Sequence, residues 1–131
     1  MDAKNNVLII TDGSEGVSGM ASKIAAALKG STVSVKVAHE FKGNDLLPAE
    51  AFFLGCEKPE PESFNYLTDL LKHINLAGRP CGVFSSGAQK TAKYLAGIVK
   101  DCDAVLNPAA FLAGQEADTK SWAKNVISRA F

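Results

Sequence analysis

The sequence lacks an excess of charge of either sign and lacks any long apolar run. Fourteen Lys and Arg residues balance fourteen Asp and Glu residues, whereas nucleic-acid-binding domains normally carry a basic excess or stripe. No apolar run approaches the ~20 residues that span a bilayer. The polar residues 1–6 also lack the apolar segment of a secretory signal peptide. We therefore expect no nucleic-acid partner, no membrane partner and a cytoplasmic location.

Cysteine and histidine are scarce, which bears on disulfides, metals and catalysis. The cysteines are Cys56, Cys81 and Cys102, an odd number without a CxxC pair, so we predict three free thiols rather than a disulfide framework or a zinc site. His39 and His73 are the two histidines, and neither lies near a second metal ligand in the sequence. Because no Ser-His-Asp or Cys-His grouping emerges either, we predict no metal site and assign no catalytic residue.

What the sequence does contain is a regular alternation of short apolar runs and helical patterns. Its 131 residues, 47% of them hydrophobic, suit a single domain over residues 1–131 with a sizeable core. Apolar runs typical of buried strands occupy residues 7–10, 51–54, 81–84 and 104–106, the last continued by 111–112. Helical spacing occupies the segments from about Ser18 to 28, from a cap at Ser63 to 74, 89–100 and 119–130.

Two further segments complete the pattern. Residues 31–38 alternate valines with polar residues, as expected of a strand at a sheet edge. Residues 39–47, which follow it, contain at most a very short helix. Strands that alternate with helices predict an α/β domain, with a largely parallel five-stranded sheet between two helical layers.

Three loops of small, polar or turn residues follow the predicted strands, at residues 11–19, 55–62 and 85–89. In an open parallel sheet, ligands bind beyond the carboxyl ends of the strands. The first loop contains three glycines and leads into a helix, whose N-terminal N–H groups attract phosphate. It is not a P-loop, because no GK[ST] follows, and it departs from GxGxxG spacing. We predict that the N–H groups of residues 13–17 are the main donors to any phosphate-bearing ligand.

Over residues 5–128 these segments, taken in order, resemble a short-chain flavodoxin-like protein. The resemblance rests on the strand 7–10 with its loop, the strand 51–54 ending in Gly55, the segment 79–87 (RPCGVFSSG) and the segment 104–122. It implies an α/β three-layer sandwich with parallel strands in the order 2-1-3-4-5. It also implies FMN as the cofactor, with its phosphate at the first loop and its isoalloxazine ring between the second and third. The implied cofactor-binding residues are Thr11, Asp12, Gly13, Ser14, Glu15, Gly16, Val17, Ser18, Gly55, Cys56, Glu57, Ser85, Ser86 and Gly87.

The first loop departs from the phosphate loop of that family, which reads roughly [ST]-x-[ST]-G-x-[ST]. Residues 11–18 read TDGSEGVS, so the hydroxyl residues are spaced differently and two acids are added. A like charge within a few ångströms of a phosphate costs about 1–4 kcal/mol, depending on screening. Either Asp12 and Glu15 weaken phosphate binding, or both point to solvent and stabilise the start of the helix.

Aromatic residues that would stack on a flavin ring are absent from the second and third loops. Phe64 and Tyr94 are the nearest, but both have the spacing of helical core residues, and Trp122 lies on the last helix. We predict that Phe64 and Tyr94 pack in the interior and that Trp122 packs in the core or at the surface. The resemblance implies that Cys56 faces the ring, where Lys58 favours a reactive thiolate and Glu57 opposes it. An ordinary thiol is the favoured state of Cys56 and a reactive one the alternative.

Two functions from different classes follow. The first is an FMN-binding electron carrier with an atypical phosphate loop, working with a redox partner protein. The second is a flavodoxin-like domain that has lost its flavin and acts as a binding or regulatory module. A quinone or NAD(P)H reductase is least favoured, because 131 residues leave no room for a separate nicotinamide domain. Fold resemblance by itself does not decide between these functions.

Overall fold

Strands and helices alternate along the chain as the apolar pattern predicts. The computed structural model describes residues 6–46, 48–87, 89–107, 110–112 and 119–128. In chain order the elements are β1 (Asn6–Thr11), α1 (Glu15–Ala27), β2 (Thr32–Val37), α2 (Gly43–Leu46), β3 (Ala51–Gly55), the 3₁₀ helix η1 (Glu62–Phe64), α3 (Asn65–His73), β4 (Pro80–Ser85), α4 (Gln89–Lys100), β5 (Val105–Leu106), β6 (Phe111–Leu112) and α5 (Thr119–Ser128).

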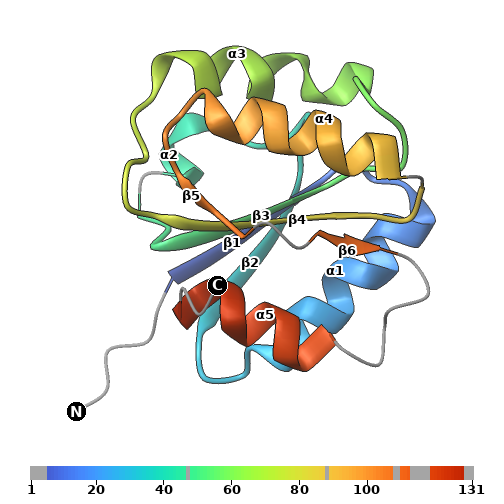
Figure 1. Cartoon of the computed structure of the whole chain (residues 1–131), viewed down its shortest axis with the longest axis vertical. Coiled ribbons are helices and arrows are strands. Elements are labelled where there is room, and N and C mark those ends of the chain that lie inside the picture. Colours follow the sequence, from blue (N-terminus) through green and yellow to red (C-terminus); the bar gives the residue numbers. More distant parts are fainter. Residues whose placement is uncertain (1–5, 47, 88, 108–109, 113–118, 129–131) are drawn as a thin grey trace.

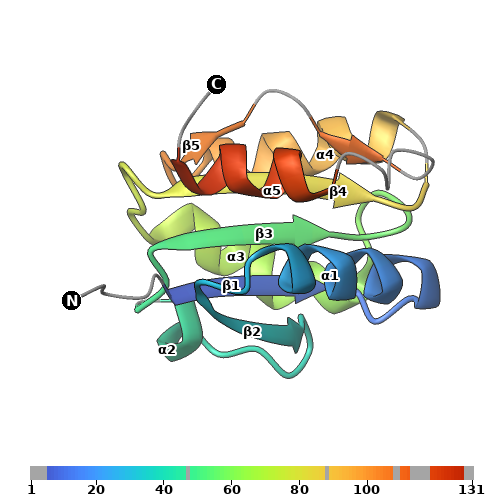
Figure 2. The same ribbon diagram turned by 90° about the horizontal axis from the view of Figure 1, so that it is seen from below.

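The sheet is parallel, with strand order β2-β1-β3-β4-β5, which confirms the expected order. β5 pairs with the start of β4 at Pro80 and Cys81, and β6 pairs with its end at Phe84 and Ser85. The two short strands therefore form one interrupted edge, as predicted for a last strand that continues at residues 111–112. Figure 2 shows the strands β1 to β4 pointing toward the same edge of the molecule.

Helices cover both faces of this sheet (Figure 1): α2, α3 and α4 lie on one side, and α1 and α5 on the other. Alternate residues of each central strand therefore enter different cores. Leu8 and Ile10 join the core beneath α3 and α4, whereas Val7 and Ile9 join the core beneath α1 and α5. Two-sided burial is the reason that these strands are continuous apolar runs rather than alternating ones.

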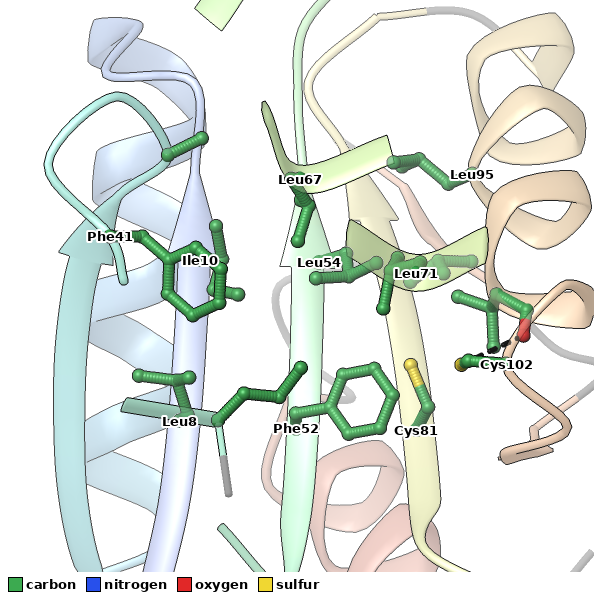
Figure 3. Close-up of a cluster of buried hydrophobic side chains, with 14 of the residues drawn as sticks. Leu8, Ile10, Phe41, Phe52, Leu54, Leu67, Leu71, Cys81, Leu95 and Cys102 are labelled. Atoms are coloured by element: carbon green, nitrogen blue, oxygen red, sulfur yellow. Dashed lines mark hydrogen bonds between the residues drawn. The ribbon is translucent and has the colours of Figure 1, made fainter. Parts of the chain in front are cut away.

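Figure 3 shows the first of these cores, in which side chains of β1 and β3 face α3 and α4. Phe52 and Leu54 of β3 pack here with Leu67, Leu71 and Leu95, all of them fully buried. By contrast β2 lies at the sheet edge, and Val35 is 49% exposed. The edge position predicted from the alternation of residues 31–38 is thus confirmed.

Two helix starts differ from the sequence prediction. α1 begins at Glu15 and not near Ser18, because the Ser18 N–H already donates to the Ser14 carbonyl at 2.9 Å. The cap predicted at Ser63 is wrong, because that residue lies inside η1. The Phe64 N–H donates to the Pro61 carbonyl at 2.9 Å, and this turn carries the Phe64 ring into the core.

Other predicted boundaries agree with the structure or lie outside its described part. Between residues 39 and 46, the part of this segment that the structure describes, the only helix is the four-residue α2, and α4 spans the predicted residues. Ala88, Pro108, the turn expected at residues 114–118 and the helix end at 129–130 lie outside the described residues. Within the described part of the chain, no helix is both long and apolar enough to traverse a membrane.

Candidate functional site

The carboxyl ends of β1, β3 and β4 bring the three predicted loops together at one edge of the sheet. Thr11 pairs with Gly55, and Gly55 pairs with Phe84, so the residues that follow each strand emerge side by side. The arrowheads in Figure 2 mark this edge. The residues implied as cofactor-binding all lie on these three loops or at the adjoining strand and helix ends.

Asp12 is the residue that joins the first loop to the second. Its carboxylate Oδ1 accepts hydrogen bonds from the Ser14 N–H at 3.0 Å and the Ser14 hydroxyl at 2.7 Å, and its Oδ2 accepts one from the Glu57 N–H at 2.9 Å. The interpretation that both acids point to solvent is therefore wrong for Asp12, although Glu15 is exposed. Three donors fix a negative charge inside the candidate site.

The N–H groups predicted as phosphate donors are only partly available. The Gly13 N–H donates to the Thr11 hydroxyl at 3.2 Å, and the Ser14 N–H donates to Asp12. Glu15, Gly16 and Val17 are the first residues of α1, and their N–H groups have no acceptor among the residues that the structure describes. Gly13 adopts φ +83°, a conformation that favours glycine. The loop thus offers three donors beside a carboxylate.

The second and third loops touch through the backbone of Glu57. Its carbonyl accepts hydrogen bonds from the Thr91 hydroxyl at 3.2 Å and the Ser85 hydroxyl at 3.5 Å, and the latter accepts one from the Gly87 N–H at 2.9 Å. A Cβ on Gly87 would overlap the Glu57 carbonyl oxygen, so glycine is required by this close approach. Sequence reasoning missed Thr91, which stands in the first turn of α4 without any motif to mark it.

Ser86 occupies the junction of the first and third loops. A Cβ on Gly16 would lie 3.0 Å from the Ser86 Cβ, which shows how closely α1 approaches this loop. The Ser86 hydroxyl oxygen is buried and has no hydrogen-bond partner among the described residues. A buried hydroxyl without a partner is uncommon in native structures, and this one lies beside the start of α1.

Cys56 does not face the site as a reactive group. Its side chain is 0% exposed and belongs to the core beneath α3 and α4. Burial, together with the negative charge of Asp12, raises the pKa of Cys56 to about 12. The thiol therefore stays protonated near neutral pH, which disfavours the reactive alternative. All three cysteines are free, as predicted, and all three, Cys56 included, are buried.

The aromatic residues pack in the interior, as predicted for Phe64 and Tyr94. Phe64 is fully buried and Tyr94 packs against the same core. Trp122 lies in the opposite core, with its ring centroid 5.4 Å from that of Phe53 and 5.1 Å from that of Phe111. None of these rings belongs to the second or third loop. Among the described residues, no group of three or more His, Cys, Asp and Glu side chains is arranged to hold a metal ion.

Raising the pH above about 9 is expected to destabilise the protein through its buried thiols. Burial raises the pKa of Cys56 from 9.0 to about 12 and also raises the pKa of Cys81 and Cys102. Because the folded state disfavours thiolates, this stabilisation is complete below pH 9 and is lost as the pH rises toward 12. Between these two pH values each pH unit costs about 1.4 kcal/mol through Cys56, and Cys81 and Cys102 change the stability in the same direction.

Urea unfolding between about pH 8 and pH 11 measures this loss. The variant Cys56→Ala removes one titrating group, so its free energy of unfolding should fall less steeply above pH 9. Equal slopes for the variant and the native protein would show that Cys56 ionises as easily when folded as when unfolded.

Comparison with known proteins identifies structures that share this architecture. No protein-family model matches the sequence, and no curated protein matches it. Among solved structures, a short-chain flavodoxin associated with a non-canonical PDU bacterial microcompartment is 14% identical, with a TM-score of 0.83 over 98% of this chain and 100% of that one. Oxidised flavodoxin 2 from Bacillus cereus is 19% identical, with a TM-score of 0.79 over 98% and 100%.

A third structure, a Fusobacterium nucleatum flavodoxin bound to flavin mononucleotide, is 12% identical, with a TM-score of 0.69 over 98% of this chain and 97% of that one. The TM-scores establish a shared architecture, whereas sequence identities this low leave the chemistry of the loops open. The strand order, the two helical layers and the full-length superposition agree with one another: the chain has the flavodoxin-like fold.

Proposed function

We propose that this protein is a flavodoxin-like module that acts by binding another molecule and does not retain FMN as a tightly bound cofactor. The observation that carries the proposal is the Asp12 carboxylate, which lies within the first loop and accepts two hydrogen bonds from Ser14 and one from the second loop. The residues at this edge suit FMN poorly at both its phosphate and its ring.

The phosphate of FMN would meet the negative charge of Asp12, whose carboxylate already occupies local hydrogen-bond donors. The hydroxyl and N–H of Ser14, which would otherwise face an anion, donate to Asp12. A phosphate dianion in this loop would compete for those donors and lie near a fixed carboxylate. Repulsion between unit charges about 4 Å apart amounts to about 1 kcal/mol in water and about 4 kcal/mol near a protein surface.

The ring end lacks both stacking partners and open space between the loops. The second and third loops contain no aromatic residue, and stacking on such a ring contributes about 0.5–1.5 kcal/mol beyond area burial. The Glu57 carbonyl also contacts Gly87 and accepts the Thr91 hydroxyl. A ring placed between these loops would therefore have to separate them and break that hydrogen bond.

A second candidate is the FMN-binding electron carrier, which would work with a redox partner protein. It is favoured by the unpaired N–H groups at the start of α1 and by the partnerless Ser86 hydroxyl beside them. The flavodoxin from Fusobacterium nucleatum, with the same fold, is bound to flavin mononucleotide. The balance between the two candidates therefore depends on the affinity for FMN.

Titration of FMN into the native protein, followed by quenching of flavin fluorescence, is expected to show weak binding or none. The double variant Asp12→Thr/Glu15→Asn should bind FMN at least about tenfold more tightly, because it removes two like charges and frees the Ser14 donors. A matched control, Glu40→Gln/Asp69→Asn, removes the same net charge from exposed positions outside the three loops. It should leave the affinity unchanged.

Tight binding of FMN by the native protein, unimproved in the double variant, would reject the proposed module and favour the electron carrier. If the native protein binds FMN and still does so after valine replaces Gly13 or Gly16, then the ligand lies outside the first loop. Equal gains in the double variant and the control would show that net charge alone, and not Asp12, sets the affinity.

A further inference from the structure

A groove runs between α1 and α5 on the face of the sheet opposite α3 and α4. The two helices lie side by side with the same direction (Figures 1 and 2). The main hollow measures about 550 Å³, and its lining includes the small residues Ala26, Ala27 and Gly30. A second hollow of about 230 Å³ shares Ala27, Gly30 and Lys124 with it. Together they extend from Thr119, where α5 begins, to Ile127 near its end.

Positive charge gathers along both walls of this groove. Lys23 and Lys29 rise from the α1 side, and Lys120 and Lys124 rise from α5. All four are exposed, and none is ion-paired with a residue in the described part of the chain. α5 contains no Asp or Glu, and the single acid of α1 is Glu15 in its first turn. The protein as a whole is electrically neutral, so this is a local concentration of unpaired cations.

The carboxyl edge of the sheet has the opposite character. Asp12, Glu15, Glu57, Glu60 and Glu62 gather on or beside the loops there, where the described cations are Lys58 and Lys90. An acidic partner is repelled from this edge and attracted to the groove, so the two surfaces would orient it during approach.

We propose that the groove between α1 and α5 docks an acidic segment of a partner protein. The segment would place carboxylates against Lys23, Lys29, Lys120 and Lys124 while its backbone lies against Ala26, Ala27 and Gly30. This inference deepens the binding-module function and rests on it, since it names the surface and the chemistry of the partner.

The shape of the groove favours a polypeptide over other anions. The ten residues of α5 correspond to about 15 Å of helix. An extended chain covers that length in about five residues, whereas one phosphate ion would meet only part of it. Single-stranded nucleic acids bind through aromatic stacking as well as cations, and no aromatic side chain in the described part of the chain lines either hollow.

The test uses the native full-length protein and a synthetic peptide of about ten residues that alternates glutamate with alanine. Two-dimensional amide NMR should show shifts at Ala26, Ala27 and Gly30, with an affinity that falls as salt is raised from about 50 to 300 mM. The glutamine version of the peptide should not bind. Charge reversal in Lys23→Glu/Lys124→Glu should weaken binding about tenfold or more.

The matched control is Lys36→Glu/Lys93→Glu, which makes the same charge change at exposed positions on β2 and α4. It should keep the native affinity within about twofold. A thermal unfolding curve for each variant checks that the variant remains folded. Equal losses in both variants, or peptide shifts elsewhere, would overturn the proposal. If tripolyphosphate or a short single-stranded DNA shifted the same amide signals and bound more tightly than the peptide, the proposal that an acidic polypeptide occupies the groove would be overturned. None of these measurements involves FMN. A negative result here would therefore reject the groove as a docking site without deciding whether the protein binds FMN.

Discussion

Replacement of Trp122 by alanine is expected to lower the free energy of unfolding by about 3–5 kcal/mol. Trp122 is 8% exposed and joins α5 to the sheet. Its ring stacks on Phe111 of β6 with an interplanar angle of 24° and meets Phe53 of β3 at 60°. Alanine would leave a cavity between these elements, and the loss of both ring contacts would add to the lost burial.

Urea unfolding followed by circular dichroism measures this change, since the variant loses the protein's single tryptophan and with it the fluorescence signal. The control is Trp122→Phe, which keeps an aromatic ring against Phe53 and Phe111 and should cost clearly less than alanine. A loss below about 1 kcal/mol for alanine would be the size of an ordinary surface effect. It would mean that α5 does not depend on this contact.

Replacement of Gly55 by alanine is expected to destabilise the protein by about 1–3 kcal/mol, although it adds only one methyl group. A Cβ at this position would overlap the ring of Phe84, its partner on β4. Because Phe84 is fully buried, its ring cannot turn into solvent to make room. The strands β3 and β4 would have to shift at the point where the second and third loops begin.

Gly97→Ala is the matched control for this substitution. Gly97 lies in α4, and a Cβ there would meet no atom within 4 Å. The same added methyl group should therefore stabilise the protein by about 0.5–1 kcal/mol, the usual difference between glycine and alanine in a helix. Denaturant unfolding of the two variants should give changes of opposite sign. A neutral Gly55→Ala variant would show that Phe84 moves aside at little cost.

The sequence by itself determined the elements whose signals are local. Continuous apolar runs predicted the central strands, because every side chain of a strand that is buried on both faces lies in a core. Alternation at residues 31–38 predicted the edge strand, and the odd cysteine count predicted free thiols. The order of the strands came from the resemblance of several segments in register. These features depend on neighbouring residues and on burial, both of which a linear pattern records.

Tertiary structure alone decided the character of the candidate site. The sequence does not say whether the side chain of a loop residue such as Asp12 points to solvent or to the protein. Asp12 points to the protein because its carboxylate accepts a hydrogen bond from the Glu57 N–H, 45 residues away in the chain. The approach of Gly87 to the Glu57 carbonyl and the gathering of Lys23 with Lys124 likewise join distant segments. No local pattern records such contacts, because the strand order and the packing of the helices create them. The predicted loops were therefore found where expected, but their hydrogen bonds and charges could be read only from the folded chain.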